Sequence, residues 1–253
     1  MSITIILLCI IAFFAGIVDA IVGGGGLIQT PAGLILLPNH SVAQVIGSLK
    51  IPSFSGTFFA ARTFLQKIKI PFTRLFLFTS VAFSASYLGS FCLTKVSNQF
   101  MKPVILIVLA LIAIYTFTKK DFGQATKNEQ LQFPWYKAAL ICLVLGFYDG
   151  FIGPGAGSLL VLAFISFLGF DFLQANAHAK VVNLATNLGS IVLFTMKGVI
   201  LWPIAIPMAI CNALGGMVGS KLAMAKGNGF IRTVFLVVIM GTLCRLGYDV
   251  FLH

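Results

Sequence analysis

Apolar stretches recur along the whole chain and are separated by short polar or glycine-rich breaks. Cutting at the breaks gives ten segments, which are 3–22, 25–38, 41–64, 71–93, 101–118, 135–152, 155–168, 172–195, 201–221 and 231–251. A membrane-spanning helix needs about 20 apolar residues, and most segments approach that length. Segments 25–38 and 155–168 have only about 14 residues, or ~21 Å as a helix. We therefore expect an all-α polytopic membrane protein with about 8–10 membrane segments, in which each short segment is a half-helix or the return arm of a re-entrant hairpin.

Chemically distinctive residues recur at one offset. Asp19 and Asp149 lie 130 positions apart, and the same offset links Lys50 to Lys180, Gly23 to Gly153, Gly25 to Gly155 and Lys67 to Lys197. No gap is needed to align the two halves. The offset predicts two copies of one unit, a first repeat at 1–118 and a second at 135–253, joined by a polar linker at 119–134.

The overall composition excludes an ordinary soluble domain. The chain is 59% hydrophobic and 9% charged, whereas soluble proteins carry roughly 25% charged residues. The net charge of +11 does not indicate nucleic-acid binding, because the basic residues are dispersed along the chain. Most lie at segment ends, where basic residues typically set membrane topology and contact lipid headgroups. The five cysteines form no C-x-x-C motif, and no metal-ligand cluster or nucleotide-binding loop occurs. We expect the lipid bilayer as a partner and no cofactor, and the sequence leaves homo-oligomerisation open.

The distribution of basic residues favours inverted copies. With an odd number of crossings in each copy, one side holds Arg62, Lys67, Lys69, Arg74, Lys119, Lys120, Lys127, Lys137, Lys221, Lys226 and Arg232. The other side holds Lys95, Lys102, Lys197 and Arg245. An even number of crossings gives a less biased division. The positive-inside rule therefore predicts inversion, with the richer side cytoplasmic and both termini outside. Inverted repeats with paired interrupted segments are typical of transporters with a site at the membrane midplane.

Four charged residues, Asp19, Asp149, Lys50 and Lys180, lie inside apolar segments. A charge within the bilayer costs several kcal/mol unless it is paired or hydrated. The charges could form two structural ion pairs that hold the copies together. Alternatively the lysines lie in an anion pathway, and protonation of the aspartates couples that pathway to a proton gradient.

Polar side chains accompany both lysines at helical spacing. Asn176, Lys180, Asn183 and Asn187 are spaced by 4, 3 and 4, and Lys50, Ser53 and Thr57 by 3 and 4. Each set therefore forms one face of a helix, which should face protein or water rather than lipid. Polar contacts between helices are the alternative explanation. We expect Lys50, Ser53, Thr57, Lys180, Asn183 and Asn187 to contact a bound anion.

Glycine runs follow each membrane aspartate, with Gly23, Gly24 and Gly25 in the first copy and Gly153 and Gly155 in the second. These runs should end one helix and begin another, whose N-terminus offers free N–H groups and partial positive charge. Two such ends meeting near the midplane could hold an oxyanion. Close packing of helices through small residues is the alternative.

Histidine and serine chemistry offers weaker candidates. His178 could take part in proton coupling, although an interhelical contact explains it equally simply. Ser158 with His178 is the Ser/His combination an intramembrane enzyme would require, but it lacks a nucleophile elbow, and we expect no enzyme. Unpaired cysteines argue against a thiol relay.

The motif that repeats in the two copies resembles the TauE/SafE sulfite exporter family, also called the 4-toluene sulfonate uptake permease family. It reads GIVDAIVGGGGL at 16–27 and GFYDGFIGPGAG at 146–157, and ANAHAKVVNLATNLGS follows the second. The matched positions are Gly16, Asp19, Gly23, Gly25, Gly146, Asp149, Gly153, Gly155, Lys180 and Asn183. The resemblance covers most of the chain, and the second motif departs from a plain glycine run at Pro154 and Ala156.

The resemblance implies a multi-pass permease of the cytoplasmic membrane that moves sulfite, sulfoacetate or other organosulfonates. The residues and the resemblance together predict a secondary transporter of small anions. A membrane scaffold or assembly factor, in which the charges are only structural, and an anion-selective channel remain as alternatives.

Overall fold

The apolar segments fold into helices in the computed structural model, which describes residues 3–97, 99–100, 104, 107 and 135–251. The helices are α1 (Ile3–Val22), α2 (Gly25–Leu36), α3 (Val42–Leu65), α4 (Phe72–Leu93), α6 (Trp135–Phe151), α7 (Ala156–Leu168), α8 (Phe172–Met196) and α9 (Trp202–Phe251). No strand occurs within the described ranges. Ile3–Val22, Thr73–Leu93, Phe172–Met196 and Trp202–Gly227 are long and apolar enough to cross a membrane. The chain is an all-α polytopic membrane protein, as the hydropathy pattern predicts.

The boundaries depart from the sequence-based segments mainly in α9. Two segments, 201–221 and 231–251, were expected there, but the helix continues beyond 221 and is interrupted at Gly227, whose φ is 70°. Ala223, Met224 and Lys226 favour helix, so the chain stays helical until a glycine adopts a left-handed conformation. The predicted segment 101–118, apart from Val104 and Ile107, and the predicted linker 119–134 lie outside the described residues.

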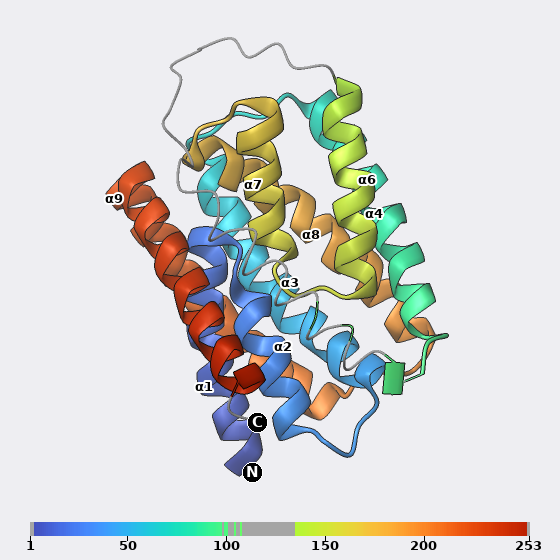
Figure 1. Cartoon of the computed structure of the whole chain (residues 1–253). Coiled ribbons are helices and arrows are strands. Elements are labelled where there is room, and N and C mark those ends of the chain that lie inside the picture. The colour runs from blue at the N-terminus through green and yellow to red at the C-terminus, as the bar shows by residue number, and fades with distance from the viewer. Residues whose placement is uncertain (1–2, 98, 101–103, 105–106, 108–134, 252–253) are drawn as a thin grey trace.

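The two short helices run back along the helices that precede them. Leu37, at the end of α2, packs in one cluster with Leu8 near the start of α1. Phe167, near the end of α7, lies in one groove with Lys137 near the start of α6. Figure 1 shows α1 with α2 and α6 with α7 as two helical hairpins. The short segments are therefore return arms, and their tips lie inside the bundle.

The two hairpins pack against helices from the other half of the chain. A Cβ placed on Gly89 of α4 would lie 2.2 Å from the Phe147 carbonyl oxygen of α6. A Cβ placed on Gly219 of α9 would lie 2.4 Å from the Ile17 carbonyl oxygen of α1. Both contacts involve the same pair of positions, shifted by 130 residues, with the halves exchanged. Such close approach of backbones is what small residues permit in membrane bundles.

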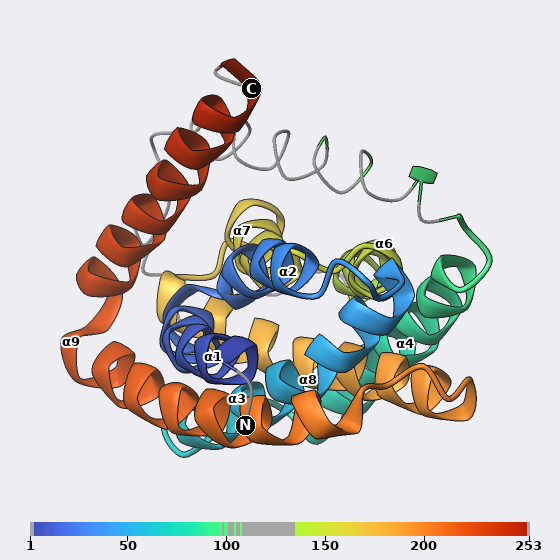
Figure 2. The same ribbon diagram turned by 90° about the horizontal axis from the view of Figure 1, so that it is seen from below.

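Helices α3 and α8 cross at the centre in opposite directions. Gly47, early in α3, lies against the Phe194 ring near the end of α8, whereas Thr57, late in α3, lies within 3.4 Å of Asn183 in α8. Figure 2 shows the bundle along its length, with α3 and α8 among the other helices. The tips of both hairpins meet the polar faces of this central pair.

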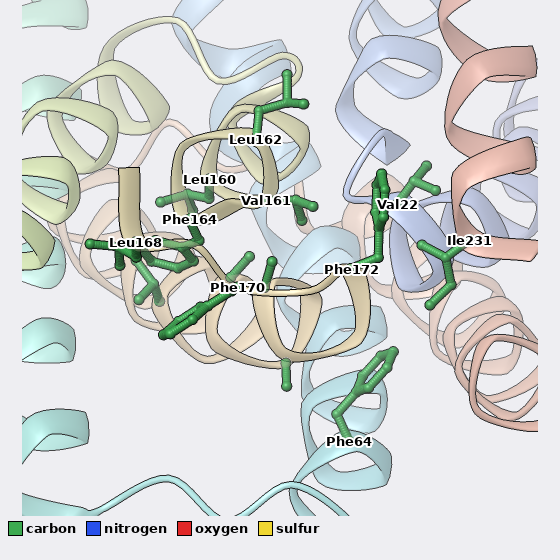
Figure 3. Packing of buried hydrophobic residues seen from close by; sticks show 14 of the residues in the cluster. Val22, Phe64, Leu160, Val161, Leu162, Phe164, Leu168, Phe170, Phe172 and Ile231 are labelled. Carbon is green, nitrogen blue, oxygen red and sulfur yellow. The ribbon is translucent and has the colours of Figure 1, made fainter. Parts of the chain in front are cut away.

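The largest buried cluster lies around α7 and the start of α8. Phe164, Phe170 and Phe172 pack there with Phe64 of α3 and Ile231 of α9. Figure 3 shows Phe164 and Phe170 on one side of the cluster and Phe172, Phe64 and Ile231 on the other. Apolar packing in the bilayer gains mainly from van der Waals contact, because lipid is as apolar as the side chains. The cluster anchors the α7 arm and so fixes the position of the glycine break that precedes it.

Candidate functional site

The two glycine breaks touch each other at the centre of the molecule. Gly23 has a φ of 77°, and Gly153 and Gly155 have φ values of 93° and 76°, a region that favours glycine. The Ser158 amide donates a hydrogen bond of 3.1 Å to the Gly23 carbonyl. A Cβ on Gly23 would lie 2.3 Å from the Gly157 carbonyl carbon. Gly23 is therefore required both by its backbone conformation and by the opposing chain.

The first turns of α2 and α7 have no side-chain caps. The N-cap residues are Gly24 and Gly155, and neither provides a side-chain hydrogen bond. By contrast, α3 begins with a capping box at Ser41, and Asp171 caps α8. Free N–H groups in a first helical turn carry partial positive charge and bind anions. The Ala156, Ser158 and Leu159 amides of α7 and the Leu27 amide of α2 already donate to backbone carbonyls at the breaks. The first-turn amides without such a bond among the described residues are those of Gly25, Gly26 and Gly157.

The membrane charges form ion pairs that cross between the halves. The Lys50 amine lies 2.8 Å from Asp149 Oδ1, and the Lys180 amine lies 3.0 Å from Asp19 Oδ2. Each amine also donates to the backbone carbonyl of its aspartate, at 2.7 Å for Lys50 and Asp149. Carbonyls near a helix C-terminus attract cations, so each lysine also stabilises the end of the helix before a glycine break.

The two pairs differ in exposure. The side chains of Lys50 and Asp149 are 6% and 4% exposed, whereas those of Lys180 and Asp19 are 1% and 14% exposed. Both pairs are formally neutral, so the four charges cancel inside the bundle. Neutralisation by a close partner is what makes burial of these charges tolerable.

Polar contacts through Thr57 and Asn183 connect the two aspartates. Thr57 Oγ1 lies 3.2 Å from Asp19 Oδ2 and 3.4 Å from Asn183 Oδ1. Asn183 Nδ2 donates to Asp149 Oδ2 at 3.3 Å, and Asn187 Nδ2 donates to Asn183 Oδ1 at 3.2 Å. Thr186 adds a short hydrogen bond to Asp149 Oδ2. Asn183 therefore contacts Asp149 directly and lies next to Thr57, which contacts Asp19 of the other pair.

A cavity of about 40 Å³ lies between the glycine breaks and the central helices. By the same measure a water molecule needs about 10–15 Å³, so the space suits roughly three waters or one small ion. The lining residues are Asp19, Gly23, Gly26, Thr30, Ile46, Leu49, Lys50, Ser53, Asp149, Gly153, Gly155, Ala156, Gly157, Asn183 and Asn187. The wall combines charged, amide and hydroxyl groups with the beginnings of both short helices.

Most of the residues singled out in the sequence gather here. Of the expected anion contacts, the residues in the wall are Gly23, Lys50, Ser53, Gly153, Gly155, Asn183 and Asn187, and Asp19 and Asp149 join them. Gly24, Gly25, Thr57 and Lys180 lie next to the wall without forming part of it. Lys180 and Thr57 reach the site through Asp19.

His178 is not brought to this cavity. Its Nδ1 lies 2.8 Å from the Gln174 carbonyl oxygen, and its ring centroid lies 4.5 Å from that of Phe170. Ser158, the other member of the Ser/His combination, donates instead to the Val22 carbonyl at 3.0 Å. Asn176, the first residue of the polar stripe, donates to the Ala20 and Ile21 carbonyls and so holds the end of α1.

Sequence reasoning missed Thr30, which lines the cavity from α2. The position 130 residues later is Leu160, which is fully buried in the apolar cluster. The repeat therefore gave no signal for this threonine. Helical spacing could have found it, because Thr30 follows Gly26 by one helical turn and shares its face.

Comparison with known proteins gives a consistent family. The family described as "Sulfite exporter TauE/SafE" matches residues 8–246. A "Probable membrane transporter protein" of Haemophilus influenzae is 33% identical over 96% of this chain and 94% of its own length. "Probable membrane transporter protein ORF9" of Sinorhizobium sp is 31% identical over 96% and 92%, and the protein YfcA of Escherichia coli K12, named in the same way, is 30% identical over 94% and 88%. No solved structure matches the chain.

Proposed function

Because the chain belongs to the TauE/SafE sulfite exporter family of membrane transporters, we propose that it is a secondary transporter of small sulfur-containing anions. Sulfite, sulfoacetate and other organosulfonates form the substrate class, and the central cavity is the substrate site. The observation that carries this proposal is the cavity enclosed by two uncapped helix N-termini beside the Lys50 amine.

Each part of the wall suits an anion. An ammonium has three donors, and Lys50 uses two of them on Asp149, which leaves one for a ligand. The amide nitrogens of the first turns add donors that need no desolvated charge. Asn183 and Asn187 supply amide groups that orient a polar ligand without repelling it. Together these groups provide partial positive charge on several sides of a space the size of a small ion.

The crossed contacts support an inverted duplication. Lysines from each half pair with aspartates of the other half, and the glycine contacts of α4 with α6 and of α9 with α1 involve equivalent positions. Under this proposal the site lies between two structurally similar units. Transport would then follow when one hairpin unit moves against the other and opens the cavity to alternate sides.

The pairing of Lys50 with Asp149 is the basis of the proton coupling that we propose. While Asp149 is ionised, it neutralises the lysine and occupies two of its donors. Protonation of that carboxylate would leave Lys50 as an uncompensated cation in the cavity wall, and an anion would then replace the lost negative charge. In this scheme the anion and a proton bind together and cross in the same direction.

The membrane is proposed to be the cell membrane, with the lysine-rich end of the bundle in the cytoplasm. The loop between α3 and α4 carries Lys67 and Lys69, and Lys137 and Lys226 lie at helix ends assigned to the same side by the inverted arrangement. Positively charged loops remain on the cytoplasmic side. We expect no enzymatic activity.

Flux into proteoliposomes tests the proposal. Sulfite, sulfoacetate, sulfate and chloride would be compared with and without a pH gradient, using protein shown to be folded by a cooperative melting transition. We expect saturable flux of a sulfur anion that increases when the gradient drives protons in the same direction. Non-saturable flux with little discrimination would indicate a channel. No flux of any anion from folded protein would favour a structural role for the ion pairs.

A further inference from the structure

The two lysines do not stand in the same relation to the cavity. Lys50 and its partner Asp149 both line the wall. For the other pair only Asp19 does so, while the Lys180 side chain is 1% exposed and lies outside the wall. The duplication that equates Lys50 with Lys180 in sequence therefore does not give them equal access to a ligand.

The hydroxyl groups of Thr30 and Ser53 in the cavity wall both come from helices of the first half, α2 and α3. Thr30 is 6% exposed as a residue and lines the cavity from α2. Ser53 lines it from α3, one turn after Lys50. Neither hydroxyl has a hydrogen-bond partner among the described residues. Thr30 is buried and Ser53 is half-buried, and both hydroxyls face a polar cavity without a protein partner, which points to a ligand that accepts from them.

The equivalent positions in the second half provide no such donors from the same elements. Leu160 replaces Thr30 and belongs to the apolar cluster. Asn183 replaces Ser53, but its amide nitrogen donates to Asp149, and its side-chain oxygen accepts from Thr57 and Asn187. The hydroxyl groups of the wall without a protein partner among the described residues thus come from α2 and α3, on the side of Lys50.

We propose that Thr30, together with Ser53 and Lys50, contacts the transported anion directly, whereas Lys180 is a positioning residue that holds Asp19 and the end of α1. The proposal deepens the proposed function and rests on it. An oxyanion has several acceptor oxygens, so one ion could accept from the amine and both hydroxyls at once. Thr30 then determines specificity for the anion.

The first test removes the hydroxyls one at a time. Thr30→Val keeps the shape of the side chain and removes its donor, and Ser53→Ala does the same for serine. Thr79→Val is the matched control, because the Thr79 hydroxyl donates to its own helix at Leu75 and does not line the cavity. Proteoliposome flux of sulfite would be measured across a range of concentrations for each variant.

We expect Thr30→Val and Ser53→Ala each to raise the KM for sulfite about tenfold, since each loses a hydrogen bond to a charged ligand. The maximal rate should change less than the KM, and Thr79→Val should match the unmodified protein. An unchanged KM in Thr30→Val, in protein that melts like the unmodified chain, would overturn the direct contact.

The second test compares the two ion pairs without leaving a buried charge unpaired. The double variants Lys50→Gln with Asp149→Asn and Lys180→Gln with Asp19→Asn each remove one pair and keep the net charge. Stabilisation of the purified protein by sulfite would be measured as a shift in melting temperature, which reports binding without transport. We expect the shift to vanish in the Lys50 variant and to persist in the Lys180 variant.

The outcomes separate this inference from the proposed function. If the unmodified protein shows neither flux nor a sulfite-dependent shift, the proposed function fails and the inference with it. If the unmodified protein transports sulfite but the Lys180 double variant also loses the shift, then Lys180 contacts the anion and only the inference fails. Persistence of the shift in the Lys50 double variant would likewise overturn the role given to Lys50 alone.

Discussion

Lys50 pairs with Asp149, 99 residues away, rather than with the aspartate of its own half. Lys180 makes the reciprocal choice with Asp19. Each half therefore lacks the partner for its own buried charge, and the halves become mutually dependent. In a membrane, where apolar burial does little to hold helices together, such crossed polar contacts can specify which helices associate.

Breaking one member of a crossed pair should be worse than removing both. Lys50→Gln leaves Asp149 buried without its cation, and we expect a loss of about 3–5 kcal/mol in the free energy of unfolding. Adding Asp149→Asn should restore most of that loss, since two amides can hydrogen-bond without charge. Reversible unfolding in detergent measures the cycle.

The mismatched double variant Lys50→Gln with Asp19→Asn is the control for that cycle. It removes one charge of each sign, but from different pairs, and so leaves two buried charges unpaired. Recovery of stability in this variant to the level of the matched double would contradict the observed pairing.

Gly23→Ala should destabilise the folded protein by more than the cost of a left-handed backbone conformation alone. Its φ of 77° costs an alanine roughly 1–2 kcal/mol. In addition, the new methyl would meet the backbone of Gly157 at 2.3 Å, where nothing flexible can yield. We expect a sharp fall in the amount of folded protein, measured as the monodisperse fraction after detergent extraction.

Gly198→Ala separates the two causes. Gly198 has a φ of 64° but an added Cβ would find nothing within 4 Å. This variant should carry only the free-energy cost of an alanine in a left-handed conformation, and it should remain largely folded. Equal behaviour of the two variants would show that the contact between the glycine breaks contributes nothing.

Cys9 and Cys211 offer a direct test of how α1 and α9 pack. Both residues pack in one cluster and line a groove between the two helices. A variant that keeps only these two cysteines should form an intramolecular disulfide with copper phenanthroline, measured as the loss of maleimide labelling that a reductant restores. A variant that keeps Cys9 and Cys92 should remain fully labelled, and labelling of the first variant after oxidation would argue against this packing.

The helices and several residues of the site could be predicted from the sequence, but the contacts between those residues could not. Hydropathy and glycine breaks located α1 to within a residue at each end, because those signals are local. The one-offset repeat identified Lys50 and Asp149 as special, but which lysine meets which aspartate depends on how the halves dock. Thr30 was missed for a related reason, since its significance arises only where α2 turns back into the bundle. Docking geometry, rather than local pattern, decided both.

Thr57 and Asn183 should act as one unit. The Thr57 hydroxyl can donate its one proton either to Asp19 Oδ2 or to the side-chain oxygen of Asn183, and the Asn183 amide donates to Asp149. Both side chains therefore belong to one polar path between the ion pairs. Removing either member interrupts that path. We therefore expect Thr57→Val and Asn183→Ala together to cost less than the sum of their separate effects, by about 0.5–3 kcal/mol, the usual range for side chains in one network. The same non-additivity should appear in flux, with the double variant no slower than Asn183→Ala.

Pairing Asn183→Ala with Thr79→Val provides the additive reference, because Thr79 hydrogen-bonds only within its own helix. Strict additivity of Thr57→Val with Asn183→Ala, in both unfolding and flux, would mean that the two ion pairs operate independently and that the polar link between them carries no coupling.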